Sequence, residues 1–387
     1  MADFRKTIYL DNAATTFPKP REVLEEMIDA YSSLGVSPGR GSYDLSMEAE
    51  ERVMTIRRQI CQFFGGSDPD RVIFSYNATD AINTLVQGLI KSGSHVVSSR
   101  LEHNSVLRPL HHFSEQGIID LDLVPFSPEG FIDPITMAEA IKPNTRFVIL
   151  THASNVLGAV QPVEQIGAIC RKQGVPLLLD VTQTAGMLPI RMDEWGVSAI
   201  AFTGHKSLLG PTGIGGLVLS PGLDVKATRF GGTGRESSSL IHTQTFPHRL
   251  EAGTINIAGI FGLSAGLNYL SIHSIEKIHA KELELTKRLR DGLNSIKGVR
   301  IYPSKGHSQH VPILLCNVDG MDPQDLSAIL DGDFGVATRA GLHCAPLVHQ
   351  DLGTSPKGGV RFSLGPFNTA KEIDRVLEAM ETIYRSK

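Results

Sequence analysis

The middle of the chain alternates short apolar runs, rich in β-branched residues, with amphipathic stretches. This alternation is typical of a mostly parallel central sheet flanked by helices, because parallel neighbours are joined by crossover connections. We predict an α/β fold on this basis. The expected strands are Arg71–Ser75, His95–Ser98, Arg146–Thr151, Pro176–Asp180, Ala199–Thr203 and Gly216–Leu219.

Helical periodicity is clearest at two places. Between Glu48 and Phe64, apolar residues recur at intervals of three and four, which predicts a helix with one buried face. Near the end of the chain, Thr369 precedes Glu372 by three residues, the spacing of a capping box, and an apolar stripe follows at helical period. Both stripes are interpreted as core.

The pattern changes after about residue 260. A long, highly charged helix is expected over Ile275–Leu293, followed by strands over Val299–Tyr302 and Val311–Val318. We predict a large domain over residues 15–260 and a smaller α+β domain that combines residues 1–14 with residues 261–387. A chain of 387 residues is long enough to build both cores.

Composition excludes several classes of function. The chain is 41% hydrophobic and 20% charged, which is ordinary for a globular enzyme. Its formal net charge of -4 provides no basic field, so we expect neither a nucleic-acid nor a membrane partner. No apolar run approaches the about 18 residues of a membrane span, and no signal-peptide core follows the first residues. A cytoplasmic location is therefore expected.

Polar residues follow each of the first five predicted strands. Ligands bind outside the carboxyl ends of strands in open parallel sheets, so these residues should face one crevice. In chain order they are Asn77, Ala78, Thr79 and Asp80, then His103, then Asn155, then Asp180 and Gln183, and finally Thr203, Gly204, His205 and Lys206.

Lys206 has two interpretations. A lysine at the end of a strand most often only reaches solvent, but this one precedes a glycine-rich run over residues 210–216, where backbone can approach a bound group closely. Amines in such places act as Schiff-base nucleophiles, because desolvation keeps part of the population neutral. Asp180, otherwise a simple loop cap, would then pair with the ring nitrogen of pyridoxal phosphate and keep it protonated.

The turn from Ser75 to Asp80 leads into a helical pattern, so its N–H groups and the helix dipole suit a phosphate, although most such turns are only helix caps. The glycines of 210–216 and 231–234 lack the strand-to-helix context of a phosphate loop and are interpreted as structural. His103 could stack on a planar cofactor and move protons, although a solitary histidine is more often structural.

Two further residues are candidates for chemistry. Cys344 lies in a loop of small residues beside Arg339 and His343, which could favour its thiolate, whereas free cysteine is usually buried and inert. Arg361 lies in a strand-like run and suits bidentate capture of a carboxylate. Wide spacing of the cysteines predicts neither a disulfide nor a metal site. The other three are Cys61, Cys170 and Cys316.

With these positions in hand, the chain resembles the class V aminotransferase family of fold type I pyridoxal-phosphate enzymes, and within it the cysteine desulfurases and selenocysteine lyases. The matching motifs follow one another in a fixed order over nearly the whole chain, which is more specific than any one of them. They are residues 9–16, 77–80, 102–104, 154–158, 180–183, 203–206, 251–254, 339–344 and 360–363.

The resemblance implies a role for each matching residue. Lys206 would hold pyridoxal phosphate as a Schiff base, with Asp180 on the ring nitrogen, Gln183 on the ring hydroxyl and His103 stacked on the ring. The phosphate would be held by Ala78, Thr79, Thr203 and His205, and by Thr254 of the neighbouring subunit in a homodimer. The substrate would lie near Asn155, with Arg361 on its carboxylate and Arg339 as a further contact.

The implied reaction converts L-cysteine to L-alanine and leaves the sulfur on Cys344 as a persulfide. Lys206 would take the Cα proton, and the Cys344 thiolate would attack the substrate sulfur. Few residues separate Arg339 from Arg361, as in the group that depends on a separate sulfur-acceptor protein.

Other functions stay open. Asp80, Val181, Thr182 and the segment 365–367 depart from the commonest family pattern, which leaves selenocysteine lyase, another C–S lyase or an aminotransferase as alternatives. A non-catalytic sulfur carrier or a regulatory binding module is a further alternative. The joint presence of Lys206, Asp180 and Cys344 argues against it.

Overall fold

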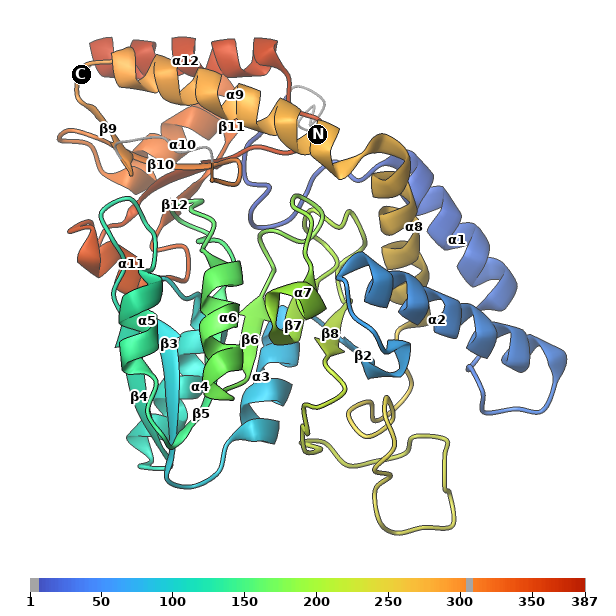
Figure 1. Ribbon diagram of the computed structural model, residues 1–387. Helices are drawn as coiled ribbons and strands as arrows, with labels where there is room; N and C mark the ends of the chain where they lie inside the picture. Colours follow the sequence, from blue (N-terminus) through green and yellow to red (C-terminus); the bar gives the residue numbers. More distant parts are fainter. Residues whose placement is uncertain (1–6, 304–308, 387) are drawn as a thin grey trace.

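The computed structural model describes residues 7–303 and 309–386. Its centre is a seven-stranded sheet in the order β2-β8-β7-β6-β5-β3-β4 (Figure 1). Strands β3 to β7 are mutually parallel, whereas β8 runs antiparallel to both of its neighbours. The strands are β2 (Val72–Ser75), β3 (Ser94–Ser99), β4 (Ile119–Val124), β5 (Thr145–Thr151), β6 (Leu177–Asp180), β7 (Val197–Thr203) and β8 (Gly215–Leu219).

The α/β prediction is confirmed, and all six predicted strands form with ends that differ by no more than two residues. Strand β4 was missed. Its sequence interrupts the apolar residues with Asp120 and Asp122, and it lies at the edge of the sheet, where one side needs no apolar cover. A buried parallel strand carries a continuous apolar run that can be recognised in the sequence, and β4 does not.

Helices cover both faces of this sheet, and alternate residues of its strands point to opposite faces. In β5, Phe147 and Ile149 pack in the same cluster as residues of α3 and α4, whereas Val148 and Leu150 pack with residues of α2, α6 and α8. The helices of this part are α1 (Arg21–Leu34), α2 (Asp44–Phe63), α3 (Ala78–Leu89), α4 (Asn104–Glu115), α5 (Pro134–Ala140), α6 (Val163–Gln173), α7 (Met192–Trp195) and α8 (Ile257–His273).

A smaller layer lies above the carboxyl ends of the parallel strands (Figure 1). Its four-stranded sheet has the order β12-β13-β10-β9, and β1 (Ile8–Tyr9) pairs with β11 beside it. The remaining elements are α9 (Ile275–Ser295), β9 (Val299–Tyr302), β10 (Ile313–Val318), α10 (Pro323–Phe334), β11 (Val336–Ala337), β12 (Arg339–Gly341), α11 (Pro346–Asp351), β13 (Gly359–Ser363) and α12 (Ala370–Arg385). The predicted capping box of α12 forms, with Thr369 and Glu372 bonded in both directions.

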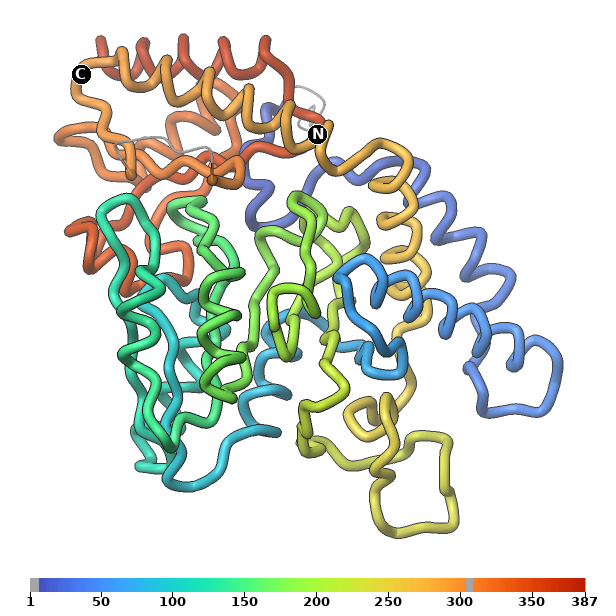
Figure 2. Tube along the Cα trace, in the orientation of Figure 1, coloured from blue at the N-terminus to red at the C-terminus, as the bar shows by residue number. Residues whose placement is uncertain are grey.

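Most apolar core residues of the two layers fall into different clusters, although Leu315 of β10 and Val348 of α11 pack with the large layer. Ile8 and Leu10, from the start of the chain, lie in the smaller core with residues of α9, α10 and α12. Helix α8 packs in the larger core. The chain then turns and enters α9, which belongs to the smaller layer (Figure 2). The predicted boundary at residue 260 falls inside α8, and the division into two domains stays a prediction.

Helix α8 is the most apolar helix around the sheet, with a hydrophobic surface on most sides. It is buried in the large core, and this burial accounts for its apolar composition. Within residues 7–303 and 309–386, no helix combines the length and the apolar character that crossing a bilayer requires.

Candidate active site

One cavity of about 510 Å³ lies at the carboxyl ends of the parallel strands. Residues that follow five different strands line it, together with two arginines of the smaller sheet. The lining residues are Ala13, Ala14, Asn77, Ala78, Thr79, His103, Ser105, Thr151, Asn155, Asp180, Thr182, Gln183, Thr203, His205, Lys206, Arg339 and Arg361. Ten of the twelve residues expected to face one crevice line this cavity, whereas Asp80, whose carboxylate contacts Arg229, and Gly204 do not. The chemical roles of the ten stay proposals.

Lys206 lies three residues beyond the end of β7, in the floor of this cavity. Burial, and secondarily the positive charge of Arg361, lower the pKa of its ammonium to about 8, against the opposing effect of Asp180. A substantial part of the side chain is thus neutral under mildly alkaline conditions. A neutral amine is the form that adds to a carbonyl carbon.

Asp180 ends β6 and is buried. Burial raises the pKa of its carboxyl, while the Thr182 N–H, which donates to Oδ1 at 2.9 Å, and the nearby Lys206 oppose that rise. Among the described residues it forms no ion pair within 4.0 Å. A buried carboxyl in this situation suits a cationic ring N–H as its partner.

Other groups that line the cavity have free hydrogen-bonding capacity. Thr203 Oγ1 and His205 Nδ1 are buried and have no hydrogen-bond partner in the described part of the chain. Helix α3 begins at Ala78, and its cap residue Asn77 accepts the Asp80 N–H at 2.9 Å, which leaves the first helical N–H groups facing the cavity. Such a set of donors could hold a phosphate group.

The predicted structural role of the glycine run holds at Gly215. Strand β8 passes the α3 turn so closely that a Cβ on Gly215 would lie 2.9 Å from the Asn77 Cα. Real Cβ atoms do not approach backbone this closely. Gly215 therefore lets the first turn of α3 lie against the sheet.

His103 is the N-cap residue of α4, and its ring also lines the cavity. Its Nδ1 accepts the Ser105 N–H at 3.0 Å, so a neutral ring carries its proton on Nε2. Burial, followed by the charges of Lys206 and Arg339, lowers the pKa of this imidazole to about 4. The ring is consequently neutral at pH 7, which suits stacking on a planar group.

The N-terminal loop, residues 11–19, contacts the cavity from the side of the small layer. The Gln183 amide donates to the Ala13 carbonyl at 3.2 Å, and Thr15 Oγ1 donates to the His205 carbonyl at 3.0 Å. Lys19 Nζ donates to the same His205 carbonyl at 2.5 Å. Residues 9–16 form one of the matching motifs, but no role was predicted for this loop, because its contacts join positions about 190 residues apart.

Arg361 is fully buried in β13 and is held on two sides. Its Nη2 contacts Asp11 Oδ1 at 2.6 Å, and its Nη1 donates to the Asn155 carbonyl at 3.0 Å. Asn155 in turn donates through Nδ2 to the His343 carbonyl at 2.7 Å, while its Oδ1 has no partner among the described residues. Asp11 was not predicted as a site residue. Its position inside the matching motif of residues 9–16 was the feature of the sequence that could have indicated a role.

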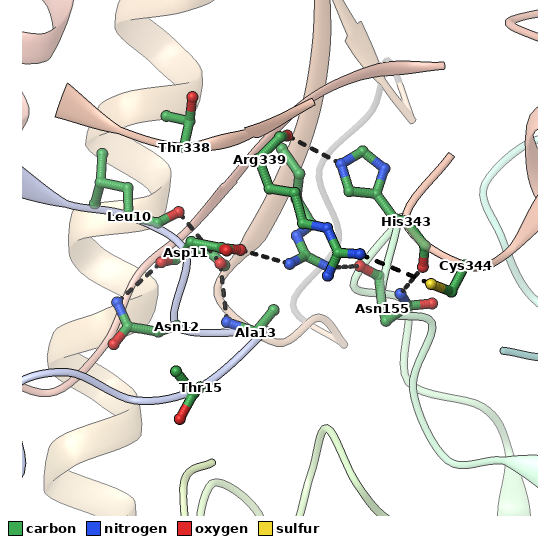
Figure 3. Close-up of polar contacts among 12 residues, drawn as sticks. Leu10, Asp11, Asn12, Ala13, Thr15, Asn155, Thr338, Arg339, His343 and Cys344 are labelled. Atoms are coloured by element: carbon green, nitrogen blue, oxygen red, sulfur yellow. Dashed lines mark hydrogen bonds and ion pairs between the residues drawn. The ribbon is translucent and has the colours of Figure 1, made fainter. Parts of the chain in front are cut away.

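Cys344 lines a neighbouring hollow of about 620 Å³ that shares Thr79, His103 and Ser105 with the first cavity. Its side chain is partly exposed, and Arg339 Nη2 lies 3.7 Å from Sγ (Figure 3). The other three cysteines are buried and unpaired. Cys344 is thus the cysteine that lines the hollow next to the cavity.

The expectation that His343 would favour the Cys344 thiolate is not supported. The ring nitrogens of His343 bond to the Arg339 carbonyl at 3.0 Å and to His349 Nε2 at 3.3 Å, away from the sulfur. Burial lowers the pKa of the His343 ring to about 3, so it carries no positive charge at neutral pH. The left-handed backbone at residues 343 and 344, with φ of 51° and 56°, sends the two side chains to different partners.

Thr254 lies outside this cavity. It lines two other hollows, one shared with α2 and the loop before it, and the other shared with residues of β2. Within one chain, therefore, Thr254 does not join the polar groups of Thr203 and His205. A phosphate contact from this residue would require a second subunit.

Known proteins resemble this chain over nearly its full length. A family model described as aminotransferase class-V matches residues 8–376. A probable cysteine desulfurase of Methanothermobacter thermautotrophicus is 34% identical over 386 residues, which cover 98% of this chain and 95% of that protein. A cysteine desulfurase of Salmonella agona is 29% identical, with 97% and 93% covered.

Solved structures give the same result. The apo structure of a cysteine desulfurase from Thermococcus onnurineus NA1 has a TM-score of 0.93 at 31% identity, and the alignment covers 99% of this chain and 96% of that one. The cysteine desulfurase CsdA of Escherichia coli has a TM-score of 0.87 at 26% identity, with 99% and 96% covered. The expected fold type I architecture is confirmed by these neighbours. On its sequence and its fold alike, this chain belongs to the class V aminotransferase family.

Proposed function

We propose that the protein is a pyridoxal-phosphate-dependent cysteine desulfurase that moves the sulfur of L-cysteine to Cys344. The main support is the arrangement of two sites side by side. A partly exposed thiol with a guanidinium 3.7 Å away adjoins a cavity that contains a lysine of lowered pKa and a buried carboxyl. An aminotransferase needs the cavity with the lysine and the carboxyl but does not need the thiol.

The residues around the cavity fit pyridoxal phosphate. Asp180 would accept the protonated ring nitrogen, Gln183 would bond the ring hydroxyl, and His103 would stack on the ring. Lys206 would carry the cofactor as a Schiff base. Its phosphate would take the unpartnered Thr203 Oγ1 and His205 Nδ1, together with the N-terminus of α3 at Ala78 and Thr79. When bound, this cofactor supplies an electron sink that stabilises negative charge at the substrate Cα.

The chain's own residues would carry out the remaining steps. Arg361, with Asn155 and Arg339 beside it, would bind the substrate carboxylate and fix Cα near Lys206, whose neutral amine takes the Cα proton. The Cys344 thiolate would attack the substrate sulfur, so that an S–S bond forms as the C–S bond breaks. Cβ keeps the electron pair and is protonated. L-Cysteine and the Cys344 thiol thus give L-alanine and a Cys344 persulfide.

A homodimer with shared sites is part of this proposal. Thr254 lies outside the cavity of its own chain, in the segment between β8 and α8. Part of this segment projects from the large layer (Figure 1). The same segment exposes Phe230, Leu240 and Ile241, whose side chains are 74% or more accessible. Exposed apolar residues of this kind are typical of a surface that is covered by a partner. Sedimentation equilibrium of the purified protein tests the dimer.

The persulfide must then pass to an acceptor, and we propose a separate protein for this step. Arg339 and Arg361 are joined through the short helix α11 and two strands, without a long loop that could carry Cys344 to a distant acceptor. Thiol chemistry of this kind requires a reducing compartment, and four unpaired cysteines suit the cytoplasm.

Mass spectrometry of the protein after treatment with L-cysteine tests the function. The peptide that contains Cys344 should gain one sulfur atom while L-alanine forms in equal amount. Peptides with the buried Cys61, Cys170 and Cys316 serve as internal controls and should stay unchanged. Alanine that forms only when a keto acid is supplied, with no added sulfur on Cys344, would instead indicate an aminotransferase. Release of selenium in preference to sulfur from competing substrates would indicate a selenocysteine lyase.

A further inference from the structure

The guanidinium of Arg361 is paired with a carboxylate of its own chain. Asp11 Oδ1 contacts Nη2 at 2.6 Å, the Asn155 carbonyl accepts from Nη1 at 3.0 Å, and the buried Nε–H has no partner among the described residues. Only 1% of the Arg361 side chain is accessible. The positive charge expected to attract a substrate carboxylate is therefore already balanced, while three of the five N–H groups of the guanidinium have no partner among the described residues.

Main-chain pairing fixes Asp11 in this place. Asp11 bridges Ser363 of β13 in parallel register, and the Asn12 N–H donates to the Ser363 carbonyl at 3.2 Å. Ser363 Oγ also accepts the Ala13 N–H at 2.9 Å. Arg361 precedes Ser363 by two residues, so both side chains leave β13 on the same face. The ion pair thus follows from strand pairing and does not depend on two flexible side chains meeting.

Asp11 acts on the charge of the cavity from outside it. The cavity is lined by the cations Lys206, Arg339 and Arg361 and by the anion Asp180, whereas Asp11 does not line it. In the proposed function Lys206 and Asp180 are engaged by the cofactor, which leaves two guanidiniums for the substrate. Asp11 offsets the charge of one of these two guanidiniums, that of Arg361.

We propose that Asp11 is a specificity-determining residue that restricts the site to amino acids with a single carboxylate. This inference rests on the proposed function, because it assumes that Arg361 binds the substrate carboxylate. A ligand with one carboxylate, such as cysteine, matches the remaining positive charge through Nε–H of Arg361 and through Arg339. A second carboxylate finds no second uncompensated cation and is repelled by Asp11.

Propionate and succinate are suitable probes of this selectivity. Succinate is propionate with a second carboxylate on its methyl group, and neither contains an amine that could react with a cofactor. Their affinities for the holoprotein are measured by ligand-observed NMR and, in parallel, by competitive inhibition of alanine formation from cysteine. The NMR measurement needs no turnover, so a failure of the desulfurase assignment would appear as missing alanine and would leave the binding result interpretable.

Asp11→Asn removes the charge and keeps a hydrogen-bond acceptor for Arg361, which Asn155 and the surrounding sheet still hold in place. We expect the affinity for succinate, relative to propionate, to rise about tenfold, which is a modest part of the several kcal/mol that juxtaposed like charges cost. Asp11→Glu restores the charge and should keep a ratio near that of the wild type. Asp374→Asn, which removes a surface partner of Arg288, is the matched control and should not change the ratio.

Two results would overturn the proposal. One is a succinate-to-propionate ratio that stays within twofold of the wild-type ratio in Asp11→Asn. The other is an equal loss of affinity for both ligands, which would show that Asp11 only holds Arg361 in position. Asp11→Ser, a smaller neutral variant, provides the same comparison if the asparagine variant does not fold.

Discussion

The Nη2 atom of Arg339 lies 3.7 Å from the sulfur of Cys344, whereas the intervening His343 directs both ring nitrogens to other partners. Of the two side chains expected to act on this thiol, Arg339 is the one that contacts it. Arg339, and not the histidine adjacent in sequence, is therefore the residue expected to control the reactivity of Cys344.

Arg339→Gln should slow alkylation of Cys344 by iodoacetamide at pH 7 by about fivefold, which corresponds to the roughly 1 kcal/mol that two solvated charges gain near 4 Å. The rate is followed by the mass of the peptide that contains Cys344, without substrate present. Arg300→Gln, at an exposed arginine near Asp319, is the control. Equal alkylation rates in Arg339→Gln and the wild type would exclude this role for Arg339.

Lys206→Ala should reduce alanine formation from cysteine by at least about 100-fold, because a positioned general base contributes this much or more. The assay is the initial rate of alanine production with pyridoxal phosphate in excess. Lys91→Ala removes an exposed lysine that does not line the cavity, and it should leave the rate unchanged. A Lys206→Ala variant that retains substantial turnover would show that another group takes the Cα proton.

Arg361→Lys should lower kcat/KM for cysteine roughly 10- to 100-fold, because a compact ammonium cannot replace the planar fork of charged hydrogen bonds. Most of the loss is expected in KM, since the carboxylate is bound both before and during the reaction. The measurement is a full saturation curve. Arg288→Lys on the surface of α9 is the control, and a change in kcat with unchanged KM would contradict carboxylate binding.

Glu282→Gln should stabilise the protein more at pH 8 than at pH 5. Burial raises the pKa of the Glu282 carboxyl from its ordinary value of 4.5 to about 8, and Oε2 has no partner among the described residues. Between these two pH values the folded state binds more protons than the unfolded state, so the wild type loses stability as the pH rises. Glutamine does not titrate, so the stability of the variant does not fall with pH for this reason.

Urea unfolding at both pH values measures the difference. We expect a gain of at least about 1 kcal/mol in the free energy of unfolding at pH 8, a small part of the cost of ionising a buried carboxyl. Glu284→Gln, on the exposed side of the same helix, should show no pH-dependent gain. A Glu282→Gln variant with the same gain at pH 5 and pH 8 would mean that the carboxyl is already ionised at pH 5.

Thr254→Ala should weaken pyridoxal phosphate binding about 3- to 10-fold, the usual range for one lost hydrogen bond, and only in the dimer. Titration of the apoprotein with the cofactor, followed by absorbance, gives the affinity. Thr245→Ala changes an exposed threonine of the same segment and is the control. Unchanged affinity in a dimeric Thr254→Ala protein would remove Thr254 from the site.

Local patterns in the sequence determined most strands of the large sheet and helices in both layers. Apolar runs of strand length and helical stripes report burial residue by residue, so six strands and α2, α9 and α12 could be predicted within a few positions. Because parallel strands present their carboxyl ends at one edge, the polar residues after them could also be assigned to one cavity from the sequence alone. Lys206, Asp180 and His103 were accessible to this reasoning.

Tertiary structure alone decided the contacts that join distant segments. Asp11 meets Arg361 across 350 positions because the first residues of the chain pair with β11 and β13, and no periodicity in the sequence specifies which strands become neighbours. The backbone conformation at His343 and Cys344 likewise determined which cation reaches the thiol. The sequence thus determined which residues gather at the cavity, and the packing of the small layer decided their partners and their charge balance.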